Sequence, residues 1–204
     1  MSTFVVPLEV VRLTDALEVG VKAAVLGTLR EAGFPVPAGL CLTTAAFHQV
    51  SGPRRARLEA ILRDDDVSDG TGTTSAARAM DAVLADLTVP EAVVAALRTA
   101  LSAIADAETP LAVRSSATVE DRADASFAGQ YQTVLGVRGE TALLAAIVAC
   151  WRSFFGANAL ATRAAAGAGS GAEAMAVLIQ RLSDGRVSRD RPDVGVESCA
   201  RLPT

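Results

Sequence analysis

The stretch Leu111–Val137, LAVRSSATVEDRADASFAGQYQTVLGV, decides how the rest of this chain is interpreted. It begins with an apolar run that ends at Arg114, and it closes with a second strand-like run, Tyr131 to Val137. Small and polar residues with hydroxyl, amide and glycine groups lie between the two runs. This pattern is typical of a binding site, because two strands hold a loop whose N–H groups and hydroxyls can face a ligand.

Arg114 is the candidate ligand-binding cation of this stretch. It follows three apolar residues, which predicts that its backbone lies near a core while its guanidinium reaches the loop. A guanidinium placed in this way can bind a phosphate through two parallel hydrogen bonds. The alternative is an ion pair with Glu120 or Asp121 that only fixes the loop, and the residue pattern by itself supports both readings equally.

Composition restricts the class of protein. The 204 residues fit a single domain, and a hydrophobic share of 50% with only 4% aromatic residues predicts a core of Ala, Val and Leu. A net charge of -4 disfavours a nucleic-acid or anionic-membrane partner. No apolar run approaches the roughly 20 residues that span a bilayer, and the first residues do not form a secretory signal. The three cysteines are far apart in the sequence. Together these features predict a cytoplasmic protein.

Periodicity predicts an α/β (α+β) fold, with a mixed sheet flanked by helices. Strands are expected near Leu40, Val113, Thr133 and Ile179. The segment Leu58–Gly72 is interpreted as a mobile insertion within the domain. Apolar residues at helical spacing predict helices over residues 20–32, 45–50, 73–87, 90–106 and 140–155.

Four segments resemble the N-terminal nucleotide-binding domain shared by pyruvate phosphate dikinase, phosphoenolpyruvate synthase and rifampin phosphotransferase. The signature is the VRSSATVED run from Val113 followed by SFAGQYQT from Ser126. The other segments are Gly20–Val21–Lys22 with Gly33–Gly39 running into Thr43–Thr44, then Cys150–Phe155, then Ala174–Leu182. The four occur in the family's order and cover roughly residues 15 to 182.

The resemblance implies the first part of an ATP-grasp-like domain that binds ATP. It implies that Lys22 and Arg114 contact phosphates, that Gly129 and Thr133 meet the nucleotide through backbone and hydroxyl, and that Gln180 lies at the adenine side. Taken without the resemblance, these positions have ordinary interpretations. They are a solvated lysine at a helix start, a turn glycine, an outward strand threonine and a polar residue at a strand end.

The resemblance ends at Leu182. Residues 1–182 are therefore predicted to be an incomplete nucleotide-binding domain, and residues 183–204 a divergent, disordered tail of a truncated or frameshifted product. In intact relatives ATP phosphorylates a histidine carrier, which passes the phosphate to pyruvate or to an antibiotic. The spacing from Arg114 to Gln180 favours the rifampin phosphotransferase branch.

Mg²⁺ is expected for the family, but its acidic ligands are not found in this chain, so no metal ligand or catalytic residue is assigned. The prediction is the ATP-binding part of a kinase-class phosphotransferase, with weak nucleotide binding and negligible turnover. The alternative is a non-catalytic pseudoenzyme or partner-binding module, which would be folded but would not bind nucleotide.

Overall fold

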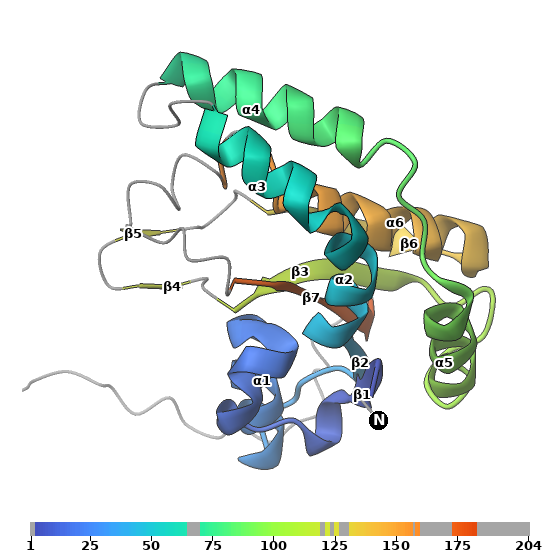
Figure 1. The fold of residues 1–204 in the computed structure, drawn as a ribbon. Coiled ribbons are helices and arrows are strands. Elements are labelled where there is room, and N and C mark those ends of the chain that lie inside the picture. Colours follow the sequence, from blue (N-terminus) through green and yellow to red (C-terminus); the bar gives the residue numbers. More distant parts are fainter. Residues whose placement is uncertain are drawn as a thin grey trace, which may run out of the picture.

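The structure is a computed structural model, and it describes residues 3–64, 70–118, 121–122, 125–126, 131–156, 158–159 and 173–182. Its centre is a five-stranded sheet with helices on both sides (Figure 1). The strand order is β1-β2-β7-β3-β6, with bounds Val5–Pro7, Gly39–Leu42, Met175–Arg181, Leu111–Ala117 and Thr133–Val137. A separate pair consists of β4 (Asp121–Arg122) and β5 (Ala125–Ser126).

Strand β7 lies at the middle of the sheet because its residues are apolar on both faces. Every residue from Met175 to Gln180 is buried, and such unbroken apolar runs are typical of strands covered on both sides. It pairs with β2 on one edge and with β3 over seven residues on the other. The sheet therefore joins segments from the start, middle and end of the described chain.

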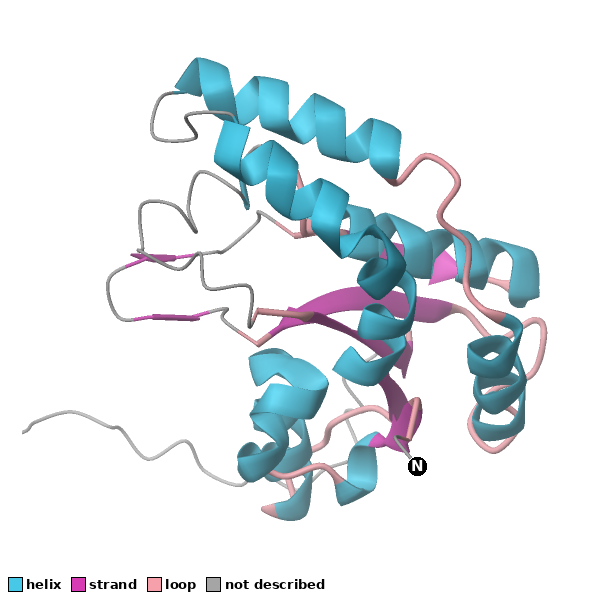
Figure 2. Cartoon of the chain, viewed as in Figure 1, coloured by secondary structure: helices cyan, strands magenta, loops and turns pink. Residues whose placement is uncertain are grey.

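In the described part of the chain, helices α1 to α6 surround the sheet, and Figure 2 shows them against its strands. Their bounds are α1 Ala16–Glu31, α2 Thr44–Ser51, α3 Arg55–Asp64, α4 Gly70–Val83, α5 Glu91–Leu101 and α6 Gly139–Ser153. Short 3-10 turns cover η1 Leu8–Val10, η2 Leu13–Asp15 and η3 Gly52–Arg54. Gly33 ends α1 in the usual manner of a C-terminal glycine, since it has φ +85° and its N–H donates to the carbonyl of Arg30.

The two faces of the sheet have separate cores. On one face, Val113 and Val177 pack with residues of α2 to α6, including the fully buried Trp151. On the other face, Leu178 and Cys41 pack with small residues of α1 and with the segment around Leu8. This division follows from the alternation of side chains along each strand. The α1 face is the one that carries the candidate site.

The predicted fold class is confirmed, and all four predicted strand positions fall in strands of the five-stranded sheet. The sequence predicted a mixed sheet, whereas the pairings between described strands are all antiparallel. Strand direction could not be derived, because β7 pairs with strands that lie far away in the sequence.

The segment Leu58–Gly72, interpreted from the sequence as a mobile insertion within the domain, is helical at both of its ends. Helix α3 runs through Asp64 and α4 begins at Gly70, while residues 65–69 lie outside the described part. Leu58 is 4% exposed and belongs to the larger core. The acidic run and the glycines in this segment obscured the two helices in the sequence.

Candidate functional site

Strand β3 presents different chemistry to its two sides. Val113, Ser115 and Ala117 alternate with Arg114 and Ser116 along the strand. Val113 and Ala117 pack in the larger core. Ser116 faces the other way, where its Oγ accepts a hydrogen bond from the backbone N–H of Ala23 in α1 at 3.1 Å. Arg114 is therefore directed to the α1 side of the sheet, as its position two residues before Ser116 requires.

The Arg114 guanidinium includes a nitrogen that the protein does not satisfy. Arg114 Nε is buried and has no hydrogen-bond partner among the described residues. A buried N–H without an acceptor is costly, so such a group in a cavity is a candidate donor to a ligand. Across the β3–β6 pairing, Arg114 lies opposite Thr133. The sequence alternative paired Arg114 with Glu120 or Asp121; Glu120 and the Asp121 side chain lie outside the described residues.

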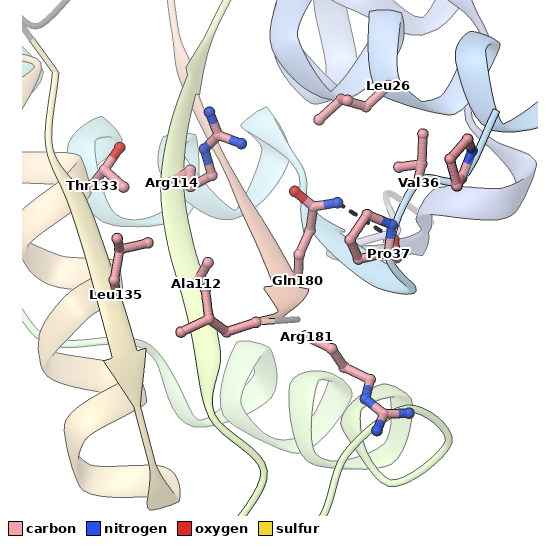
Figure 3. A pocket seen from close by; sticks show the side chains of 11 residues that line it. Leu26, Val36, Pro37, Ala112, Arg114, Thr133, Leu135, Gln180 and Arg181 are labelled. Carbon is pink, nitrogen blue, oxygen red and sulfur yellow. Dashed lines mark hydrogen bonds between the residues drawn. The ribbon is translucent and has the colours of Figure 1, made fainter. Parts of the chain in front are cut away.

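A cavity of about 420 Å³ lies on this face of the sheet. Figure 3 shows Arg114 and Thr133 on neighbouring strands at one end, and Gln180 beside Pro37 towards the other. Apolar side chains make up most of the remaining wall: Leu26 from α1, Pro35, Val36 and Pro37 from the following loop, and Ala112, Leu135 and Leu182 from the sheet side. An apolar slot with a cation at one end suits a ligand that has a planar ring and an anionic group.

Lys22 contacts the backbone of β3 at the residue that follows Arg114. Its Nζ donates to the carbonyl oxygen of Ser115 at 2.9 Å, although Lys22 does not line the cavity. As predicted, Lys22 follows a glycine in the first turn of a helical segment. Helix α1 is broken at Gly20, where φ is +76° and ψ is 161°, so a new helical turn starts next to β3.

The junction between α1 and β3 depends on Gly20. A Cβ at this position would lie 2.0 Å from the backbone oxygen of Ser116 and 2.4 Å from its Oγ. The absence of a side chain allows the helix to approach the strand closely, and the positive φ is accessible to glycine. The Ser116 hydroxyl then accepts a hydrogen bond from the N–H of Ala23 near the start of the new helical turn. The same approach places Lys22 over β3, where its Nζ donates to the carbonyl oxygen of Ser115.

The ammonium of Lys22 influences the pKa of a buried thiol, that of Cys150. Burial raises the pKa of Cys150 to about 12, and the nearby ammonium of Lys22 opposes this rise. Burial also raises the pKa of Cys41 well above its ordinary value. Both thiols therefore remain protonated at neutral pH, and they act as small buried residues.

The structure brings most of the predicted site residues together at one cavity. Arg114, Thr133 and Gln180 line one cavity, and Lys22 lies behind its arginine end. Gly129 lies outside the described residues. His48, which the sequence analysis did not assign to the site, is exposed on α2 and does not line the cavity.

Sequence reasoning missed most of the cavity wall. Arg181 adds a second arginine to the lining, and its guanidinium points away from Arg114 in Figure 3. The exposed Leu135, 63% accessible, lies two residues after Thr133 on the same edge strand. The period of two along β6 could have identified it, since it places Leu135 on the same face of the strand as Thr133.

Neither a metal cluster nor a membrane-crossing helix was found where the structure describes the chain. Among these residues, no three His, Cys, Asp or Glu side chains come together in a way that could hold a metal ion. No helix in the same residues is both long enough and apolar enough to cross a membrane.

Comparison with known proteins gives the same family as the sequence motifs. Residues 16–198 match the family described as pyruvate phosphate dikinase, AMP/ATP-binding domain. The match extends beyond Leu182, where the motifs identified in the sequence end.

Curated relatives support the match. The chain is 37% identical to a rifampicin phosphotransferase of a Streptomyces species, over 90% of this chain and 22% of the relative. It is 32% identical to a probable phosphoenolpyruvate synthase of Staphylothermus marinus, over 91% of this chain and 23% of the relative. A rifampicin phosphotransferase of Bacillus subtilis is 33% identical over 89% of this chain and 21% of the relative. The chain thus spans about a fifth of the length of these relatives. The chain belongs to the pyruvate phosphate dikinase AMP/ATP-binding domain family.

Proposed function

We propose that this chain is the ATP-binding portion of a dikinase-type phosphotransferase, and that the cavity on the α1 face of the sheet binds the nucleotide. In this proposal the phosphates lie towards Arg114 and Thr133, and the base lies in the apolar slot towards Gln180. Gly129 is proposed to meet the nucleotide through its backbone.

The observation that carries the proposal is the unsatisfied Nε of Arg114. It is buried without a described partner, and its residue lines a cavity whose walls are otherwise largely apolar. Phosphate oxygens are strong acceptors for a guanidinium, whereas the proline and leucine side chains suit a base. Lys22 adds positive charge close by, since its Nζ is held on the carbonyl next to Arg114.

The described lining residues include no carboxylate that could hold Mg²⁺. The proposal is therefore limited to nucleotide binding and contains no phosphoryl-transfer step. Transfer through a histidine carrier to pyruvate or to an antibiotic would belong to a longer protein of the relatives' kind, and we expect no turnover from this chain by itself. We further propose a cytoplasmic location.

Isothermal titration with ATP tests the proposal. Arg114→Ala should weaken binding about tenfold to a hundredfold, because a hydrogen bond to a charged group is worth about 1.5–3 kcal/mol. Arg78→Ala is the matched control, since Arg78 is exposed on α4 and does not line the cavity. This variant should bind ATP like the unmodified chain.

Two results would contradict the proposal. The first is equal ATP affinity in the Arg114→Ala and Arg78→Ala variants. The second is the absence of binding heat from a chain whose circular dichroism shows that it is folded. That second result is what the alternative function, a non-catalytic module that binds a protein partner, predicts.

A further inference from the structure

The backbone of Gln132 is held from two sides, directly before β6 begins. Its carbonyl oxygen accepts hydrogen bonds from the N–H of Ser115 at 3.1 Å and from the Ser115 hydroxyl at 2.7 Å. A longer contact to the same oxygen comes from the thiol of Cys150 at 3.6 Å. The N–H of Gln132 donates to the hydroxyl oxygen of Ser153 in α6 at 3.2 Å. Two serines from different elements therefore fix both backbone polar groups of Gln132.

The hydroxyl of Ser115 occupies a position that packing alone would give to an apolar side chain. Ser115 is 1% exposed, and it alternates along β3 with the same period as Val113 and Ala117, which pack in the larger core. A buried hydroxyl is costly unless it makes a hydrogen bond. Positions where a sequence departs from the best local packing are often functional. The hydrogen bond to Gln132 is the contact that accounts for a serine here.

The strand ladder that places Thr133 opposite Arg114 is irregular. The β3–β6 pairing changes register between Leu111 and Val113, whereas β3 pairs with β7 in continuous register over seven residues. A register shift lets a strand move locally against its neighbour. The position of Thr133 therefore depends on what fixes β6 at its start, and Gln132 is the residue directly before it.

We propose that Ser115 and Ser153 are positioning residues for the phosphate end of the cavity. The two serines fix Gln132, and this holds the hydroxyl of Thr133 beside Arg114. Directly opposed residues of an antiparallel pair share one face of the sheet, and Thr133 and Arg114 both line the cavity (Figure 3). Neither serine is among the described residues that line it, so each acts through the backbone. This inference rests on the proposed function, because it requires the phosphates to lie at this end.

The experiment compares the affinities for ATP and for adenosine by isothermal titration. Adenosine lacks the phosphates, so a misplaced Thr133 should lower the affinity for ATP alone. Ser115→Ala should weaken ATP binding by about threefold to tenfold, the range expected for one lost hydrogen bond, and should leave adenosine binding unchanged. Ser153→Ala should act in the same way, because it releases Gln132 on the α6 side.

Ser51→Ala is the matched control. Ser51 is a half-buried serine on α2 whose hydroxyl also donates to a backbone carbonyl oxygen, that of Phe47, at 2.9 Å. It does not line the cavity. This variant loses the same kind of hydrogen bond at a distance from the ligand, and it should bind ATP and adenosine like the unmodified chain.

A second measurement tests whether the serines act through Thr133. In a chain that already carries Thr133→Val, adding Ser115→Ala should change the ATP affinity by less than about twofold, because the hydroxyl that the serine positions is gone. A serine that only supports the fold would weaken ATP and adenosine alike, with or without Thr133→Val. Thermal melting of each variant checks that it is folded at the titration temperature, and Ser153→Ala carries the test if Ser115→Ala is unfolded.

Three results would contradict the inference. Equal ATP affinity in the folded Ser115→Ala, Ser153→Ala and Ser51→Ala variants would overturn it and leave the proposed function intact. An undiminished effect of Ser115→Ala in the Thr133→Val chain would do the same. Failure of the folded, unmodified chain to bind ATP would overturn both the inference and the proposed function.

Discussion

Replacing Gly20 by alanine should destabilise this protein more than replacing any comparable glycine in the same helix region. Two independent effects add at this position. The backbone has φ +76° and ψ 161°, a region that is almost restricted to glycine. The new methyl group would also lie 2.0 Å from the backbone oxygen of Ser116, so α1 and β3 would have to separate.

The magnitude can be worked out for each effect. A non-glycine residue in this backbone region costs about 1–3 kcal/mol. Forcing a methyl group into a packed contact costs about 1–3 kcal/mol more. Together they predict a loss of about 2–6 kcal/mol in the free energy of unfolding. Separation of the two elements would also disturb the hydrogen bonds that Ala23 and Lys22 make to Ser116 and Ser115.

Gly33→Ala is the matched control, because Gly33 also has a positive φ, +85°, but a Cβ there meets nothing within 4 Å. It should cost about 1–2 kcal/mol, from backbone conformation alone. Urea unfolding followed by circular dichroism measures both variants. If Gly20→Ala destabilises the protein no more than Gly33→Ala, the close approach of α1 to β3 does not limit the side chain at position 20.

Three other predictions concern buried and ion-paired groups. Phe154→Ala should lower the free energy of unfolding by about 3–5 kcal/mol in chemical denaturation, because Phe154 is 6% exposed and packs against Phe47 with ring centroids 5.3 Å apart. The thiols of Cys41 and Cys150 should resist labelling by a thiol reagent at pH 8 until the chain unfolds, measured in a variant whose third cysteine is serine. Both pKa values are raised by burial, and fast labelling in the folded state would contradict this. Hydrogen bonding from Arg98 lowers the pKa of Glu140, so the stability it contributes is present above the unfolded pKa of about 4.3 and is lost as pH falls through the folded value. Melting temperatures of Glu140→Gln should therefore fall less steeply below pH 4.3 than those of the unmodified chain, and parallel curves would exclude this contribution.

Sequence patterns predicted the elements of the fold better than their arrangement. The apolar runs around Val113 and Ile179 predicted two central strands, because residues covered on both faces must be apolar. The pairing of β7 between β2 and β3 could not be derived, since it depends on contacts between residues far apart in the sequence, as in Leu40 and Ile179 or Leu111 and Arg181.

Sequence reasoning identified polar residues that line the cavity, Arg114, Thr133 and Gln180, but it did not identify the apolar residues of the wall. Arg114 interrupts an apolar strand, and this signal is visible in one sequence because a buried position for a cation is unusual. Leu26 and Val36 give no such signal, as they resemble any core residue. The hydrogen bond from the Gln180 amide to the carbonyl oxygen of Pro37 could not be predicted either, because the two residues lie far apart in the sequence.

Arg114 has a consequence for folding that is separate from ligand binding. A shift of β3 by one residue against β7 would move every side chain of the strand to the opposite face. Val113 would enter the cavity, and the guanidinium would enter the core beneath α6, where no charge partner is described and several kcal/mol would be lost. The charge proposed to bind the nucleotide therefore also excludes the wrong strand register while the sheet assembles.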